Sequence, residues 1–174
     1  MLNNEKVEKF SFKDSDTTNI TANELEQKEY HVTSVTSQKR NRNPYAPFTT
    51  STLQQSASTN LKVSPRDVMS TAQKLYEAGL ITYMRTDGIE MAPEGITSAR
   101  KQISNSLGDH YLPEKPRVFK NKAKNAQEAH ECIRPTDFSQ TPAKSKNLNK
   151  AELELYTLIW KRALASQSLS LIHI

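Results

Sequence analysis

The part of the sequence between residues 50 and 167 carries repeated helix signals, and these constrain the fold more than any other feature. From Thr50 onward, apolar residues recur four positions apart, which places them on one face of a helix. Ser64 and Pro65 are typical of a second helix start, because serine caps free backbone N–H groups and proline fits the first turn. Gly79 suits the end of that helix, since glycine readily adopts a left-handed conformation.

Two further helices follow the same logic. Pro93 predicts the start of a third helix and Gly108 its end. Asn149 and Glu152 have the spacing of a capping box at the start of a fourth. The apolar stripes are Leu53, Ala57 and Leu61; Val68, Ala72, Leu75 and Tyr76; Ile96, Ala99, Ile103 and Leu107; and Leu153, Tyr156, Ile159, Trp160 and Ala163. The sequence thus predicts a compact, mostly α domain, with an extended run at residues 80–84.

The first 46 residues have a different pattern. Residues 7–12 and 30–35 are rich in β-branched and aromatic side chains and predict strands, with a short helix at 22–27 between them. Two or three strands cannot bury a core by themselves, so we expect them to belong to a sheet completed by other chain. A basic connector follows, and Pro44 and Pro47 mark a boundary.

Charge and cysteine content restrict the classes of protein. The 174 residues include 24 Lys and Arg against 19 Asp and Glu, a net charge of +5. This balance permits a nucleic-acid partner, although many basic domains bind none. The single Cys132 excludes an intrachain disulfide and a cysteine-rich zinc site. With no signal peptide and no apolar run near the roughly 20 residues of a membrane span, we expect a soluble, cytoplasmic protein without a membrane partner.

Three segments of the predicted helical domain resemble the type IA DNA topoisomerases, the bacterial topoisomerase I group. They are PFTTSTLQQ at residues 47–55, GLITYMRTD at 79–87 and QEAHECIRPT at 127–136. Motifs of this length, in this order and spacing, are far more specific than one short pattern. The resemblance implies a winged-helix or CAP-like active-site domain at 47–167, preceded at 1–46 by a few β-strands of an incomplete gate domain.

The resemblance also implies a catalytic set. Tyr83 is the expected nucleophile, which attacks the DNA backbone and stays joined to the 5′ phosphate. A free tyrosine hydroxyl ionises only at about pH 10, so the reaction needs help with the proton. In an extended segment Arg85 would share a face with Tyr83, and the matching family arginine pairs with the phosphate. His130 corresponds to the family histidine and can donate a hydrogen bond or proton to that phosphate.

Eight further residues are candidate DNA contacts: Thr49, Thr50, Ser51, Thr52, Gln54, Thr82, Thr86 and Arg134. Their hydroxyl, amide and guanidinium groups suit phosphate and sugar oxygens. Each also has an ordinary structural reading, since threonine or serine caps helices and arginine binds helix-terminal carbonyls. Outside its motif, Tyr83 would read as a half-buried core residue, Arg85 as part of a surface ion pair, and His130 as a solvated helix residue.

Some features depart from the family pattern. Gly88 stands where many relatives have serine, and Cys132 where alanine is usual. Residues 168–174 cease to resemble the family, and we interpret them as an atypical, non-native tail. No set of metal ligands is evident. The family uses Mg²⁺ held by a Toprim domain, so we expect these residues to bind no metal and the chain alone to be inactive.

The sequence therefore predicts part of an enzyme that cleaves one DNA strand, allows strand passage and reseals, relaxing negative supercoils. Its expected partner is single-stranded or negatively supercoiled DNA, and we expect a monomer associated with the bacterial nucleoid. A non-catalytic helical DNA-binding module is the alternative, and a protein-interaction domain is a third reading. Covalent capture of DNA separates the first from the second, and a DNA titration at low salt separates both from the third.

Overall fold

The computed structural model describes Glu8 and residues 11–29, 31–32, 34–36, 43–120 and 131–169. It divides the chain into two compact units, Met1–Arg40 and Asn41–Ile174. The first unit contains helix α1 (Ser15–Glu26), which buries none of its residues. The helix predicted at 22–27 thus begins earlier, because Asp14 accepts a hydrogen bond from the Thr17 backbone N–H and caps it.

The two strands predicted in the first unit are not seen where the structure describes them. Glu8 and residues 11–12 of the first segment, and 31–32 and 34–35 of the second, belong to no strand; the rest of both segments lies outside the described residues. A strand needs a neighbour to satisfy its backbone groups. The described residues of this unit supply none, so the composition of the two segments alone does not produce a strand there.

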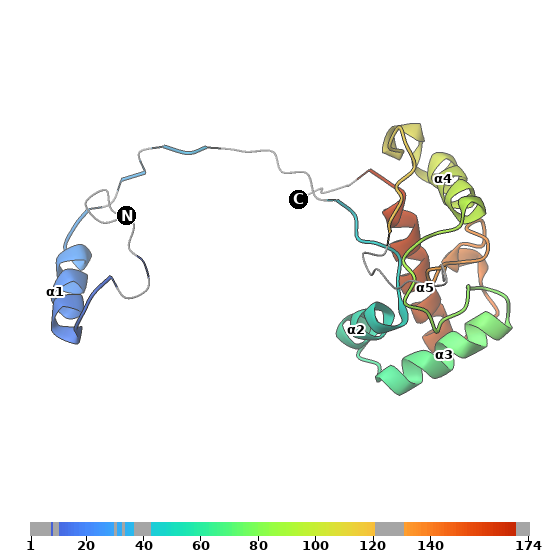
Figure 1. Cartoon of the computed structure of the whole chain (residues 1–174), viewed down its shortest axis with the longest axis horizontal. Helices are drawn as coiled ribbons and strands as arrows, with labels where there is room; N and C mark the ends of the chain where they lie inside the picture. Colours follow the sequence, from blue (N-terminus) through green and yellow to red (C-terminus); the bar gives the residue numbers. More distant parts are fainter. Residues whose placement is uncertain are drawn as a thin grey trace. The chain divides into compact units, whose positions relative to one another are not determined.

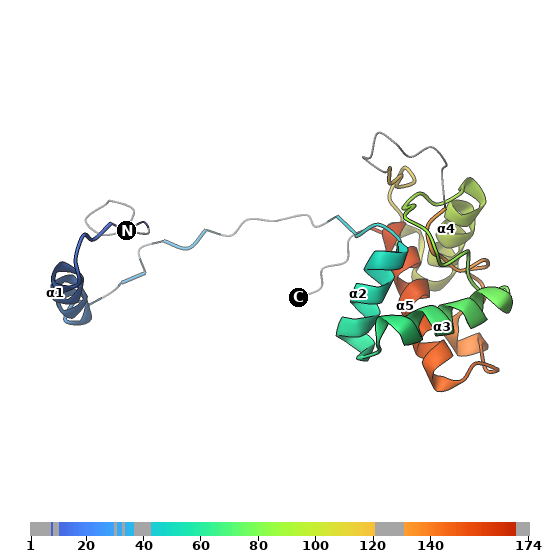
Figure 2. The ribbon, with the colours of Figure 1, turned by 60° about the horizontal axis from the view of Figure 1, so that its bottom comes forward.

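The second unit contains four long helices at the predicted places (Figure 1). They are α2 (Thr50–Leu61), α3 (Pro65–Glu77), α4 (Pro93–Leu107) and α5 (Lys150–Ser166), with short 3-10 helices η1 (Asp109–Tyr111) and η2 (Pro142–Lys144). Helix α5 lies in the middle and contacts α2, α3 and α4 (Figure 2). The mostly helical class predicted for this part of the chain is confirmed.

The helix ends follow the predicted capping chemistry. Ser64 accepts from the Asp67 backbone N–H with Pro65 in the first turn of α3, and Gly79 has φ +71° just beyond its end. Asn149 and Glu152 form the capping box of α5. Local hydrogen bonding is therefore sufficient to set these boundaries.

Two apolar clusters make up the core of this unit. The larger one joins α2, α3 and α5 and includes Leu75 and Tyr156; the smaller one lies between α4 and α5. Trp160 packs against both clusters, and its Nε1 donates to the Phe138 carbonyl at 3.1 Å. Burial raises the pKa of Tyr156 to about 12, and its hydroxyl donates to the Gln140 carbonyl at 2.6 Å. The two clusters thus form one continuous interior along α5.

Extended segments run between the helices and meet at residues 131–135, here called the central segment. Three isolated bridges join it to Phe48, Ile81 and Glu90, through Ile133, Pro135 and Glu131 respectively. Among the described residues this pairing does not grow into a ladder, so the strands of a winged-helix fold are not confirmed.

Residues near both ends of the second unit pack on its own helices and loops. Arg162 of α5 donates from Nε to the Ala46 carbonyl at 2.7 Å and stacks on the Tyr45 ring, 4.5 Å from its centroid. At the other end, Leu169 donates its backbone N–H to the Tyr111 carbonyl at 2.7 Å. The first residues of the predicted atypical tail therefore pack on the domain, and residues 170–174 lie outside the described part.

Replacing Leu75 by alanine should lower the free energy of unfolding by about 2–5 kcal/mol, because the side chain is 1% exposed in the larger cluster. Leu107→Ala is the matched control, since Leu107 is 43% exposed and should cost less than about 1 kcal/mol. Urea unfolding followed by Trp160 fluorescence measures both. Equal losses in the two variants would contradict the described core.

Candidate active site

Tyr83 lies in the segment of residues 80–87 between α3 and α4, here called the Tyr83 segment. The chain bends at residues 80, 82, 84 and 85, so the extended run predicted at 80–84 is confirmed only at Ile81, which forms a bridge. Its side chain is 47% exposed, whereas Met84 and Thr86 are buried and Arg85 is exposed. Tyr83 and Arg85 are thus both exposed to solvent, each followed by a buried residue that fixes the segment on the protein.

The start of α2 holds one end of the Tyr83 segment. The Thr50 hydroxyl donates to the Met84 carbonyl at 2.7 Å and accepts from the Thr86 N–H at 2.8 Å. The Thr50 backbone N–H also donates to the Thr86 carbonyl at 2.9 Å. Thr50 therefore holds the chain directly after Tyr83 and on both sides of Arg85, and we call these bonds the Thr50 clamp.

The central segment holds the other end. Thr82 donates its backbone N–H to the Arg134 carbonyl at 2.9 Å, and its hydroxyl accepts from the Arg134 N–H at the same distance. That hydroxyl donates to the Cys132 carbonyl at 2.7 Å. Cys132 is fully buried, and desolvation raises its thiol pKa to about 12. The residue immediately before Tyr83 is therefore anchored to a buried strip of chain.

The remaining candidate contacts have different surroundings. Thr49 and Thr52 form the capping box of α2, so Thr49 is the N-cap of this helix. Ser51 is exposed and accepts from Gln55 at 3.3 Å, while Gln54 is half-buried on the same helix. The hydroxyl of buried Thr86 accepts from the Gly88 N–H at 2.9 Å. Every threonine among these candidates thus has a hydrogen-bond partner inside the protein.

Arg134 is placed unlike the other candidates, because its side chain is only 6% exposed. Its Nε bonds the Glu131 carboxylate, and its Nη1 donates to the Pro135 carbonyl at 2.9 Å. Its Nη2 lies 3.7 Å from a carboxylate oxygen of Glu94, at the start of α4. The guanidinium therefore interacts with two carboxylates and a carbonyl of the protein itself.

Sequence reasoning missed one neighbour of Tyr83. The ring of Tyr76, in the last turn of α3, meets the Tyr83 ring edge-to-face with centroids 5.3 Å apart. Such aromatic contacts restrict ring orientation. The sequence pattern places Tyr76 in an apolar stripe, yet its side chain is 42% exposed. The only signal in the sequence was its place just before the turn at Gly79, which folds the chain back.

Two predictions from the sequence concern His130 and a metal ion. His130 lies outside the described residues, which resume at Glu131. Among the described residues, no group of three or more His, Cys, Asp or Glu side chains is arranged to hold a metal ion. Nor does any helix there have the length and apolar character needed to cross a membrane.

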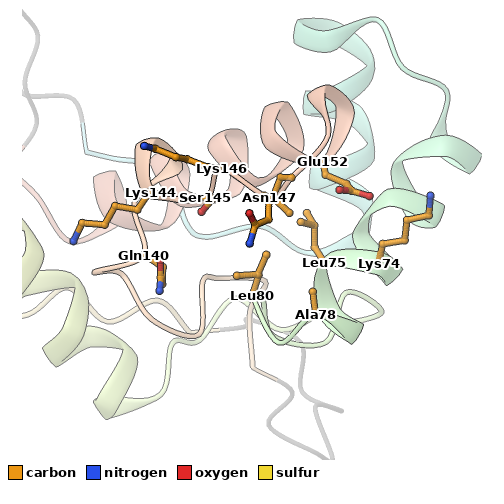
Figure 3. A pocket seen from close by; sticks show the side chains of 11 residues that line it. Lys74, Leu75, Ala78, Leu80, Gln140, Lys144, Ser145, Lys146, Asn147 and Glu152 are labelled. Carbon is orange, nitrogen blue, oxygen red and sulfur yellow. The ribbon is translucent and has the colours of Figure 1, made fainter.

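An open pocket of about 490 Å³ lies between the end of α3, the start of α5 and the loop that precedes α5 (Figure 3). Its lining residues are Lys74, Leu75, Ala78, Leu80, Gln140, Lys144, Ser145, Lys146, Asn147, Leu148 and Glu152. None of the predicted catalytic or DNA-binding residues lines it. The candidate site is therefore the exposed face of the Tyr83 segment and not this pocket.

Thr50→Val should lower the free energy of unfolding by about 1–3 kcal/mol, because valine keeps the shape but leaves the Thr86 N–H without its partner. Thr59→Val is the matched control, since Thr59 is exposed on the same helix and should change stability by about 0.5 kcal/mol or less. Urea unfolding compares the two variants, and hydrogen exchange at the Thr86 amide shows whether the clamp has opened. Unchanged exchange in Thr50→Val would contradict the clamp.

Comparisons with known proteins point to one family. A family model described as "DNA topoisomerase" matches residues 1–173. DNA topoisomerase 1 of Zymomonas mobilis is 49% identical over 166 residues, which cover 95% of this chain and 13% of that protein. DNA topoisomerase 1 of Rickettsia felis is 44% identical over 175 residues, covering 95% and 23% respectively.

A solved structure agrees with these relatives. Full-length topoisomerase I from Thermotoga maritima superposes with a TM-score of 0.64 at 37% identity, covering 75% of this chain and 21% of that one. The chain thus spans less than a quarter of the length of these relatives. With a family match along nearly its whole length, the chain belongs to the bacterial type IA DNA topoisomerases.

Proposed function

We propose that this chain is the part of a DNA topoisomerase that carries the nucleophile, Tyr83. In this proposal the enzyme cleaves one DNA strand through a 5′-phosphotyrosyl link, allows another strand to pass and reseals the break, so that negative supercoils relax. The observation that carries it is a half-exposed tyrosine on a segment clamped from two sides, within a chain that matches DNA topoisomerases over residues 1–173.

The clamps suit the chemistry proposed for Tyr83. Attack on phosphorus requires the hydroxyl to reach a phosphate and to stay in line with the leaving oxygen, so a nucleophile on a fixed backbone reacts faster than a mobile one. Thr50 and Thr82 fix the chain on both sides of Tyr83. The edge-to-face contact with the Tyr76 ring limits the directions in which the Tyr83 ring can turn.

Arg85 is proposed to stabilise the phosphate during the reaction. Its side chain is exposed, as is that of Tyr83 two residues before it. A guanidinium there can donate two hydrogen bonds to the non-bridging oxygens as negative charge builds on them. His130 is proposed to donate a hydrogen bond or proton to the same phosphate, as the family resemblance implies.

The exposed start of α2 is the proposed path of the bound strand. Ser51 and Thr52 are exposed there, beside Thr49 and the half-buried Gln54. Thr50 is proposed to hold the Tyr83 segment and not to bind DNA, because its hydroxyl already bonds the backbones of Met84 and Thr86. Mg²⁺ is proposed to act in the whole enzyme, and no residue of the described part of this chain is proposed to bind it. We therefore propose that this chain alone does not relax supercoils.

Tyr83→Phe in the full-length protein should abolish the denaturant-resistant adduct with a labelled single strand, because the attacking oxygen is gone. Tyr76→Phe is a stringent control, since this second exposed tyrosine has its ring centroid only 5.3 Å away and should leave the adduct intact. Gel electrophoresis in denaturant reports both results. Loss of the adduct in Tyr76→Phe alone would transfer the nucleophile to Tyr76, whereas DNA binding without any adduct in the unsubstituted protein would favour the non-catalytic module.

Arg85→Ala should slow cleavage about 100-fold or more, the usual loss when one donor to a developing negative charge is removed. Single-turnover cleavage of a labelled strand, measured at saturating enzyme, separates this loss from weaker binding. Lys101→Ala supplies the control, because it removes an exposed cation from α4 and should leave the cleavage rate within about twofold. A wild-type rate in Arg85→Ala would remove Arg85 from the mechanism.

A further inference from the structure

Arg134 combines burial with a charge balance that does not suit a DNA contact. Its guanidinium faces two carboxylates, Glu131 and Glu94, and the carbonyl of Pro135. Two carboxylates around one cation leave a local excess of negative charge, which repels phosphate. Its 6% exposure also leaves little of the side chain for a ligand to touch.

The same residue is joined to the Tyr83 segment through its backbone. Both its N–H and its carbonyl pair with Thr82, the residue before the proposed nucleophile. Its side-chain partner Glu131 in turn accepts from the Ala92 N–H at 3.0 Å, directly before α4. Arg134 therefore ties three separate segments together: the Tyr83 segment, the central segment and the start of α4.

Gly95 in the first turn of α4 makes room for this side chain. A Cβ atom at Gly95 would lie 2.6 Å from Arg134 Nε and 2.8 Å from Cζ, closer than van der Waals contact permits. Glycine costs a helix stability relative to alanine. A glycine at this buried position is explained by the guanidinium that packs against it.

We propose that Arg134 is a positioning residue for Tyr83, which acts through the Thr82 backbone and touches no phosphate. The inference rests on the proposed function, because it takes Tyr83 as the nucleophile. It replaces the sequence-based expectation that Arg134 binds DNA. Gly95 and Glu131 share the task, the first by leaving space and the second by bridging Arg134 to the start of α4.

A double-mutant cycle between Gly95 and Arg134 in the full-length protein tests the proposal. Gly95→Ala pushes the guanidinium aside without removing any polar group, and Arg134→Ala removes it. Each should slow single-turnover cleavage about tenfold or more, because small displacements of a nucleophile are costly. In the Arg134→Ala background, Gly95→Ala should change the rate by less than about twofold, since nothing is left to displace.

Two further measurements distinguish positioning from a phosphate contact. The dependence of single-strand affinity on salt should be unchanged in Arg134→Ala, whereas loss of one phosphate contact would lower the slope of log affinity against log salt by about 0.7. Arg134→Lys should cleave as slowly as Arg134→Ala, because an ammonium keeps the charge but cannot serve Glu131 and Pro135 together. Thermal unfolding shows whether each variant is folded at the assay temperature. If Arg134→Ala is unfolded there, the cleavage rate of Gly95→Ala alone tests the positioning role.

The outcomes separate the two proposals. An unsubstituted protein that forms no adduct at Tyr83 would overturn the proposed function. An adduct at Tyr83 with wild-type cleavage rates in the Gly95 and Arg134 variants would overturn only the positioning role. A reduced salt slope in Arg134→Ala, or a full effect of Gly95→Ala that persists without the guanidinium, would also overturn it.

Discussion

The backbone pairing of residues 131–135 is the interaction on which the rest of the helical unit depends. Three consecutive residues of this segment bond three distant stretches of chain: Cys132 donates to Glu90, Ile133 to Phe48, and Arg134 exchanges hydrogen bonds with Thr82. Phe48 and Glu90 lie shortly before α2 and α4, and Thr82 lies shortly after α3, so one buried strip sets the relative positions of these three helices. Such bonds lie away from water, where an unpaired backbone group is costly.

Helix α5 supplies the apolar counterpart of that strip. It contacts the other three long helices, and Trp160 joins the two core clusters on its surface. The proposed nucleophile lies outside both clusters. Tyr83 is held by hydrogen bonds of its neighbours in sequence and by the ring of Tyr76, while its own side chain is 47% exposed. Rigid support and an exposed reactive group are thereby combined in one short segment.

Agreement between sequence and structure was best where the interactions are local. The caps at Ser64 and Asn149, the proline at Pro65 and the glycine at Gly79 act on the next few residues, so their effect can be read without knowing the fold. The prediction of strands in the first unit was wrong where the structure describes those residues. A strand must pair with a neighbouring strand, and the composition of a segment does not supply one. Thr50 shows the same limit: it was a candidate cap or DNA contact, and its hydroxyl instead binds residues 34 and 36 positions away.

The sequence by itself determined the family, the four long helices and the likeness of Tyr83, Arg85 and His130 to a catalytic set, since motif content and helix periodicity are properties of nearby residues. Only the tertiary structure decided that Arg134 is buried between carboxylates, that Gly95 makes room for it, and that Tyr76 lies against Tyr83. The physical reason is that the environment of a charged or aromatic side chain is set by segments far away in the chain. Burial and neighbouring charges, which decide what such a group can do, exist only once those segments have packed.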